Sequence, residues 1–248
     1  PFSRYMHIPT EVVLIFLRRF GIKNKNEIKG FANFEIQACS SCGICIDICQ
    51  MYNDAQMNGQ QAVYYLQHLR FKRNDEESIY NCLMCLRCNY YCLVGIDISH
   101  LRQLKRNQLM PKLAMDIDYL HNSPKINTED IPNVMYYAGC MTHLRPGTIH
   151  AFEAILKECK VNYVFIDKES TICCGRPLFL AGAKDEAMKL VQKNTELFQS
   201  IGSKLLVTSC PICLKMFKEE YKIDIHVIHH TEFLTMLLKS NRLQLNQS

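Results

Sequence analysis

The chain has 248 residues, a formal net charge of +5 and 14 cysteines. A chain of this length builds a core without covalent staples, and its basic residues form no clustered stripe, which disfavours a disulfide-stapled scaffold and a nucleic-acid binder. The tight cysteine spacings, with no recognisable signal peptide, favour metal binding in a reducing compartment, so we expect a cytoplasmic protein.

The first predicted element is a helix that begins at Thr10 and ends at Gly21, because Thr10 follows Pro9 and precedes an apolar run. The most apolar run, residues 12–17, is far shorter than the roughly 20 residues that a membrane span needs. Residues 22–30 are polar and predict a loop.

Two cysteine quartets with the same spacing follow, displaced from each other by 43 positions. They are Cys39, Cys42, Cys45 and Cys49, and then Cys82, Cys85, Cys88 and Cys92. The segment between them, with Tyr64, Leu66, Leu69 and Phe71, is predicted to be helical. Two copies do not make a repeat array, so a pseudo-twofold pair explains the repeat better.

The Cys-x2-Cys-x2-Cys-x3-Cys spacing is the bacterial 4Fe–4S pattern, in which the fourth cysteine binds the other cluster. Three close thiolates wrap one face of a cubane, and its fourth corner needs a distant ligand. The predicted ligand sets are therefore Cys39, Cys42, Cys45 and Cys92 for one cluster, and Cys82, Cys85, Cys88 and Cys49 for the other.

Zinc and free core cysteines are the alternatives, but zinc sites use cysteine pairs rather than two such quartets. Gln50 and Leu93 stand where proline usually follows the fourth cysteine, which removes no ligand. Bound clusters bring the net charge to about +1, which again weakens a nucleic-acid function. The basic residues Arg102, Lys105, Arg106 and Lys112 are interpreted as a solvated helix face.

Residues 121–133 contain two prolines and many polar residues, and we interpret them as a linker. The predicted domains are 1–125 and 126–248. Beyond the linker the pattern predicts strands at 134–139, 161–166, 204–209 and 225–228, alternating with helices around 149–159, 187–198 and 233–237. This alternation predicts a parallel sheet with covered faces, with Cys140 and Cys210 beyond the carboxyl ends of two strands.

Apart from Cys159, the remaining cysteines read Cys-x32-Cys-Cys-Gly-x34-Cys-Pro-x-Cys. This closely resembles the cysteine-rich CCG domain of the heterodisulfide reductase B subunit and of related subunits of anaerobic glycerol-phosphate dehydrogenase. The long gap between the quartets resembles the α-helical ferredoxin modules of succinate dehydrogenase and heterodisulfide reductase. The resemblance implies an α+α/β protein, with an N-terminal α-helical ferredoxin module and a C-terminal α/β parallel-sheet CCG domain.

The resemblance implies that Cys140, Cys173, Cys174, Cys210 and Cys213 bind a noncubane 4Fe–4S cluster. Adjacent Cys173 and Cys174 would suit a ligand set in which one thiolate binds and its neighbour bridges. Gly175 would allow a tight turn there, and Pro211 would stiffen the entry to the last helix. Zinc held by four of these thiolates is the alternative.

A few other polar residues lie near the predicted sites. Cys159 shares an apolar helix face and is predicted to be a buried free thiol. We interpret each of three histidines as an ordinary surface residue in preference to a proton donor, namely His143, His229 and His230. Arg176 could attract an anionic substrate or balance the cluster charge, and these two roles stay open.

Three functions follow. The first is a heterodisulfide reductase-like subunit that passes electrons through two 4Fe–4S cubanes to the CCG cluster and reduces a disulfide. The second is a non-catalytic electron-transfer subunit between a flavoprotein dehydrogenase and quinone or another carrier. The third is a zinc-stabilised interaction module.

The chain has no G-x-G-x-x-G fingerprint, so a flavoprotein or other redox partner would carry any hydride chemistry. A second CCG-bearing subunit or a homodimer would complete a two-copy site, and a quinone-linked partner would bring the chain to a membrane.

Overall fold

The structure is a computed structural model that describes residues 5–22, 27–73, 75–109, 126 and 131–244. It contains two compact units, each of which is described here by itself. Residues 1–112 with 180–183 form unit 1, and residues 113–179 with 184–248 form unit 2. Most of the predicted linker, 121–133, and the predicted boundary residue 125 lie outside the described residues.

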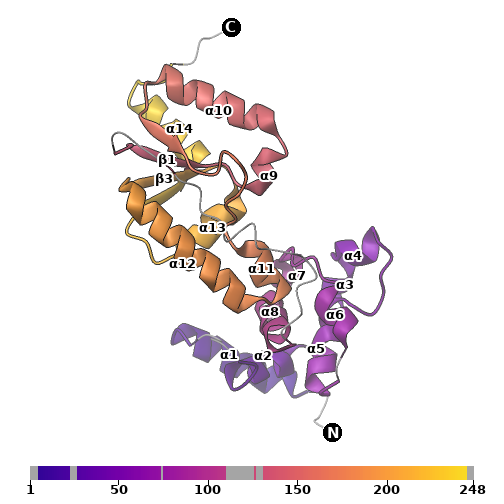
Figure 1. Cartoon of the computed structure of the whole chain (residues 1–248). Helices are drawn as coiled ribbons and strands as arrows, with labels where there is room; N and C mark the ends of the chain where they lie inside the picture. Colours follow the sequence, from indigo (N-terminus) through magenta and orange to yellow (C-terminus); the bar gives the residue numbers. More distant parts are fainter. Residues whose placement is uncertain (1–4, 23–26, 74, 110–125, 127–130, 245–248) are drawn as a thin grey trace. The chain divides into compact units, whose positions relative to one another are not determined.

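Unit 1 is helical in its described part (Figure 1). Its helices are α1 (His7–Arg19), α2 (Phe31–Ala38), α3 (Ile44–Asp47), α4 (Gln50–Asn53), α5 (Ala62–Arg70), α6 (Glu76–Tyr80), α7 (Arg87–Tyr91) and α8 (Ile98–Leu109). Apolar residues of α2, α5, α6 and α8 form one core, which Ile36, Leu66 and Leu101 represent. Four of the cysteines pack against this core, namely Cys39, Cys45, Cys88 and Cys92. The predicted helix between the quartets is confirmed by α5.

The predicted start of the first helix at Thr10 is wrong. Helix α1 begins at His7, and the Thr10 hydroxyl donates hydrogen bonds back to the carbonyls of Met6, at 2.8 Å, and His7, at 2.9 Å. Threonine in a helix interior often bonds backward in this way, so the residue type alone did not distinguish a cap from an interior position. The predicted end is close, because the helix ends at Arg19 and Gly21 has a positive φ of 72°.

The interpretation of α8 as a helix with a solvated basic face is also wrong for two of its residues. Arg102 and Arg106 are buried, with only 2% and 5% of their surfaces exposed. Lys105 is half-buried, and Lys112 lies outside the described residues. Both arginines donate hydrogen bonds to backbone carbonyls of unit 1, which is what allows their guanidinium groups to be buried.

Unit 2 contains a four-stranded parallel sheet in the order β2-β1-β3-β4. The strands are β1 (Val134–Tyr137), β2 (Tyr163–Phe165), β3 (Leu205–Thr208) and β4 (His226–His229). In the register, Met135 pairs with Val164 of β2 and with Leu206 of β3, and Leu206 pairs with Val227 of β4. All four predicted strands and the predicted parallel sheet are confirmed.

Helices cover both faces of this sheet (Figure 1). The helices that follow β1 along the chain are α9 (Cys140–His143), α10 (Pro146–Glu158), α11 (Arg176–Ala181), α12 (Lys184–Ile201), α13 (Pro211–Glu219) and α14 (His230–Lys239). Phe152 of α10 and Phe233 of α14 pack with Tyr136 on one face. On the other face the ring of Tyr137 contacts Phe217 of α13, with ring centroids 5.0 Å apart.

The three predicted helices of this half correspond to α10, α12 and α14. Pro211 occupies the first turn of α13 and so stiffens that helix, not the last one as predicted. Among the described residues, no helix is both long and apolar enough to cross a membrane.

Candidate metal centres

The two cysteine quartets fold as copies of one backbone conformation. Ser41 and Met84 occupy equivalent positions 43 residues apart, and their φ angles are +58° and +53°. Gly43 and Leu86 are also equivalent, with φ angles of +86° and +68°. Positive φ is uncommon for a residue with a side chain, and a bulky one such as Leu86 adopts it only where its surroundings enforce it. The sequence repeat is therefore a structural repeat of the cysteine loops.

The first cavity is lined by Cys39, Cys42, Cys45 and Cys92. Its other described lining residues are mostly apolar and include Ile44, Val63, Leu66 and Ile98. These four cysteines are the ones that the sequence assigns to one cluster, three from the first quartet and the fourth from the second. The structure therefore brings the predicted set together across 53 residues of chain.

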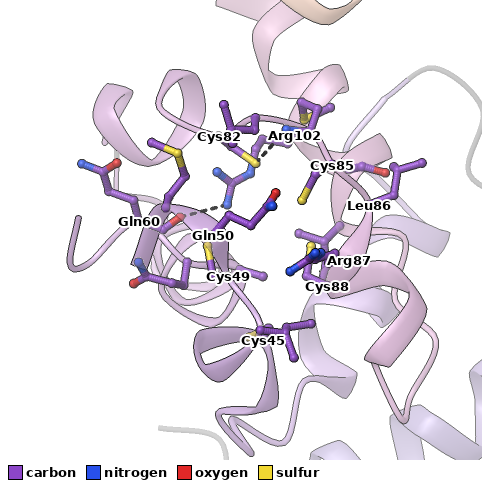
Figure 2. A pocket seen from close by; sticks show the side chains of 18 of the residues that line it. Cys45, Cys49, Gln50, Gln60, Cys82, Cys85, Leu86, Arg87, Cys88 and Arg102 are labelled. Atoms are coloured by element: carbon purple, nitrogen blue, oxygen red, sulfur yellow. Dashed lines mark hydrogen bonds between the residues drawn. The ribbon is translucent and has the colours of Figure 1, made fainter. Parts of the chain in front are cut away.

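The second cavity is lined by Cys49, Cys82, Cys85 and Cys88, again three cysteines of one quartet and the fourth of the other. Figure 2 shows their side chains around the cavity, together with Arg102 and Gln50. Cys45 lines this cavity as well as the first. The predicted set for the other cluster is thus also found in one place.

Burial makes three of these thiols hard to ionise without a compensating charge. It raises the pKa of Cys39, raises that of Cys45 to about 11 and raises that of Cys88 to about 12. Neighbouring cysteine charges raise the pKa of Cys45 and Cys88 further. Thiols in such surroundings become thiolates when a metal replaces the proton, so the cavities suit metal binding and not free thiolate chemistry.

Two cysteines of the third group, Cys140 and Cys210, lie at the carboxyl edge of the sheet, as predicted. Cys140 follows the end of β1 at the start of α9, and Cys210 follows the end of β3. The Gly139 backbone, with a φ of +85°, passes so close that a Cβ there would lie 2.7 Å from Cys210 Cβ and 3.1 Å from Cys213 Sγ. Only glycine fits this approach between the two strand ends.

The double cysteine lies on a segment whose backbone is held by three buried side chains. The Tyr137 hydroxyl donates to the Ile172 carbonyl at 2.9 Å, and the Asn194 amide donates to the Cys173 carbonyl at 2.8 Å. The Tyr221 hydroxyl donates to the Cys174 carbonyl at 3.2 Å. Gly175, with a φ of +88°, makes the predicted tight turn, and its N–H donates to Cys173 Sγ at 3.4 Å.

The thiols of this group interact with one another. Hydrogen bonds from Cys173 and Cys213 lower the pKa of Cys174, and a hydrogen bond from Cys213 lowers that of Cys210 to about 6. As the donors in these bonds, Cys173 and Cys213 have raised pKa values. Burial and the charges of Cys174 and Cys210 raise the pKa of Cys140. The five predicted ligands therefore form one electrostatically connected group.

Asp167 organises this group and lies outside every cysteine motif. Its carboxylate is buried, with 1% exposed, and accepts the backbone N–H groups of Ala138 and Gly139, each at 2.7 Å. His143 Nε2 lies 3.3 Å from the same carboxylate, which raises the pKa of the imidazole. The position of Asp167 directly after a predicted strand was the sequence signal that could have identified this residue.

The other predicted polar residues have mostly local roles. Cys159 is buried in the sheet core and donates to the Arg242 carbonyl at 3.4 Å, so the predicted buried thiol is confirmed. His229 caps α14, with Nε2 3.1 Å from the Ser209 carbonyl oxygen. Burial lowers the pKa of His230. Arg176 begins α11, half-buried beside the double cysteine.

The donor set fits polynuclear clusters. In both cavities the metal-ligating side chains of the lining are cysteines, the soft ligands that iron–sulfur clusters use. Across the described chain, no three Cys, His, Asp or Glu side chains are arranged to hold one metal ion.

Comparison with protein families agrees with this division. Residues 35–96 match the family described as 4Fe-4S dicluster domain (Fer4_8). Residues 134–218 match the family described as Cysteine-rich domain (CCG). The first match spans both quartets, and the second spans all five cysteines of the third group.

Several curated proteins are similar over most of the chain. An iron–sulfur protein of Methanocaldococcus jannaschii is 26% identical over 77% of this chain and 45% of its own length. The D subunit of dihydromethanophenazine:CoB–CoM heterodisulfide reductase from Methanosarcina barkeri is 22% identical over 85% of this chain and 65% of its own. The B subunit of fumarate reductase (CoM/CoB) from Methanothermobacter marburgensis is 20% identical over 88% of this chain and 53% of its own.

The chain thus spans about half the length of the first of these relatives and under two thirds of the others. No solved structure matches it significantly. The two domain matches and these relatives identify the chain as an iron–sulfur protein that joins a 4Fe–4S dicluster domain to a cysteine-rich CCG domain, related at modest identity to the heterodisulfide reductase D subunit.

Proposed function

We propose that this chain is an electron-transfer subunit of a larger redox complex, with two 4Fe–4S clusters in unit 1 and a third cluster at the CCG cysteines of unit 2. The observation that carries the proposal is the crossed lining of the two cavities. Three cysteines of the first quartet line one cavity together with Cys92, and three cysteines of the second quartet line the other together with Cys49 and the shared Cys45. When bound, each cluster would accept and release electrons singly.

The proposed ligands of the first cluster are Cys39, Cys42, Cys45 and Cys92, and those of the second are Cys49, Cys82, Cys85 and Cys88. The chain's own residues pack four of these thiols, those of Cys39, Cys45, Cys88 and Cys92, against an apolar core, and they also supply an N–H donor. The Met84 N–H donates to Cys82 Sγ at 3.4 Å, as a donor to a thiolate would. Such bonds stabilise the negative charge that a cluster gains on reduction.

At the third site we propose Cys140, Cys173, Cys174, Cys210 and Cys213 as ligands of a noncubane 4Fe–4S cluster. Five connected thiols exceed the four that a tetrahedral zinc ion takes, which favours a cluster over zinc. The domain division 1–125 and 126–248 is retained as part of this proposal, as is a cytoplasmic location.

The reaction that we propose for the complex is reduction of a disulfide at the CCG site. Two electrons and two protons convert one S–S bond into two thiols, and the electrons reach the site through the chain from a flavoprotein or other redox partner. A second CCG-bearing subunit, or a second copy of this chain, would complete the site. The support comes from a relative that is named as a heterodisulfide reductase subunit.

A second candidate function is electron transfer without catalysis, between a flavoprotein dehydrogenase and quinone or another carrier, with the membrane reached through that partner. The observation in its favour is that the relatives are named for different reactions, one for a heterodisulfide reductase and one for a fumarate reductase. Both are named as subunits of reductases, so electron transfer is the process common to the two named reactions.

Anaerobic reconstitution followed by iron, sulfide and zinc analysis tests the proposal first. We expect about 12 irons per chain if three 4Fe–4S clusters bind. About 8 irons with one zinc would overturn the disulfide reaction and leave electron transfer, and a folded, iron-free protein would overturn both. Assay of the holoprotein with reduced viologen and a small disulfide then separates the two functions, because rapid cluster reduction without disulfide turnover favours the second.

A further inference from the structure

The pseudo-twofold repeat of unit 1 includes an arginine for each cysteine loop. Arg70 donates hydrogen bonds to three carbonyls at the end of α2, and Arg106 donates to three at the end of α6. The acceptors are Ile36, Gln37 and Cys39 for the first, and Ile79, Tyr80 and Cys82 for the second, so each pair of acceptors is 43 positions apart. Arg70 and Arg106 are therefore equivalent.

One helical turn before each of these arginines, the equivalence breaks down. Leu66 precedes Arg70 by four residues and lines the first cavity. Arg102 precedes Arg106 by four residues and lines the second cavity. Equivalent positions beside the two cavities are thus occupied by a leucine and by an arginine.

Arg102 is a buried cation without a carboxylate partner. Its guanidinium donates to the carbonyls of Ser78 and Gln60 and lies 4.5 Å from the ring centroid of Tyr65. Its Nε is buried and has no hydrogen-bond acceptor. Among the described residues, no Asp or Glu lies within ion-pair distance of Arg102. A guanidinium stays protonated in proteins, so a full positive charge faces the second cavity.

The lining of the first cavity provides no such charge. Its described lining residues are all uncharged. Arg18, which donates to the Val94 carbonyl at 2.6 Å, lies 3.4 Å from the buried carboxylate of Glu35, and the two charges offset each other. Arg70 places a positive charge near the first cavity, and Arg106 places one near the second. Because Arg70 is half-buried and Arg106 is buried, solvent screens the charge of Arg70 more, which adds to the difference.

We propose that Arg102 raises the reduction potential of the cluster in the second cavity above that of the cluster in the first cavity. The cluster in the second cavity is then the one in unit 1 that is reduced first. The inference rests on the proposed function, since it requires both clusters. Reduction adds one negative charge to a cluster, and a buried positive charge stabilises that state strongly because little solvent screens it. One electron therefore leaves the first site and reduces the second, and no proton or bond changes.

The test is an anaerobic redox titration of the holoprotein followed by the electron paramagnetic resonance signals of the reduced cubanes. We expect two one-electron waves in the unaltered protein. In Arg102→Gln, which keeps an amide donor for the carbonyls but no charge, the higher wave should fall by at least about 59 mV, a tenfold change in the electron's distribution. Arg102→Lys, which keeps the charge, should retain most of the original separation.

Arg87→Leu is the matched control, because Arg87 also lines the second cavity but is exposed to solvent. Solvent screens an exposed charge, so this variant should shift the wave much less. Equal shifts in Arg87→Leu and Arg102→Gln would overturn the proposal, as would a shift of the lower wave alone. Arg102→Met, which keeps the packed stem, repeats the comparison if Arg102→Gln folds poorly.

The same titration distinguishes a failure of the proposed function from a failure of the proposed role of Arg102. If the unaltered protein binds no 4Fe–4S clusters in unit 1, the proposed function fails. If both cubanes bind but titrate at one potential, the proposed function stands and the role of Arg102 is overturned.

Discussion

The Asp167 carboxylate accepts two backbone N–H groups that immediately precede Cys140, one on each oxygen. In Asp167→Asn one oxygen becomes an NH2 group that cannot accept, so one buried N–H loses its partner. We expect the free energy of unfolding to fall by about 1–3 kcal/mol. Urea denaturation of the anaerobic holoprotein measures this loss. Asp185→Asn, at an exposed position of α12, should change the stability by less than about 0.5 kcal/mol.

The same carboxylate predicts a pH dependence through His143. The hydrogen bond to Asp167 raises the pKa of His143, so the folded state binds a proton that the unfolded state releases more readily. The resulting stabilisation should be complete below about pH 6.5, the ordinary histidine pKa, and should disappear as the pH rises through the raised value. Comparing the stability of the unaltered protein with that of His143→Gln across this range isolates the effect. A difference that does not change with pH would contradict it.

At single positions, a backbone conformation or a buried role could be predicted from the sequence only where the residue type itself indicated it. Gly43 could be predicted to turn beside the first quartet, because glycine adopts positive φ freely. The equivalent Leu86 has the same backbone conformation without any marker in its residue type. Arg102 was misinterpreted for a related reason, since its helix spacing also fits an exposed face and its partners are carbonyls far away in the sequence.

At the level of elements, the crossed ligand assignment makes a prediction that a simple count of iron cannot test. Cys92→Ala should remove the cluster of the first cavity, and Cys49→Ala that of the second. Adding Arg102→Gln should then lower the reduction potential of the cluster that remains in Cys92→Ala. It should not lower the potential of the cluster that remains in Cys49→Ala. The opposite pattern, measured by the same redox titration, would mean that each quartet binds its own cluster.

Long elements with a clear period were predicted well and short ones were not. α12 has apolar residues on one face over five turns, which the sequence pattern captures. α3, α4 and α9 have four residues each, too few to establish a period. These short helices nevertheless begin beside cysteines, where Gly43, Cys49 and Gly139 occupy their N-cap positions. The positions of the cysteines, and not periodicity, therefore account for these three short helices.

At the scale of the whole molecule, each unit has a hydrophobic core of its own, and cysteines of the two quartets pack against the core of unit 1, whereas the third group lies in unit 2. The cysteine spacings were sufficient to predict this separation into two kinds of site. The residues that hold the third site could not be predicted in the same way, because Asp167, Asn194 and Tyr221 reach it from three separate segments.

This separation predicts that the third site can be lost alone. In Gly139→Ala the added Cβ would lie 2.7 Å from Cys210 Cβ, on a backbone with a φ of +85°, so the ligands at the two strand ends would have to move apart. Iron should fall from about 12 to about 8 per chain, while both cubane signals and their potentials stay unchanged. If the third site holds zinc, zinc should be lost instead.

Gly147→Ala is the control for this change. Gly147 lies in the first turn of α10 without a positive φ, and a Cβ there would meet no atom within 4 Å. This variant should therefore keep all of its metal. If Gly139→Ala also lost the cubane signals, the cores of the two units would be coupled, and the independence of the sites would be wrong. If it kept all three metal centres, Gly139 would have no part in bringing Cys210 and Cys213 to the site.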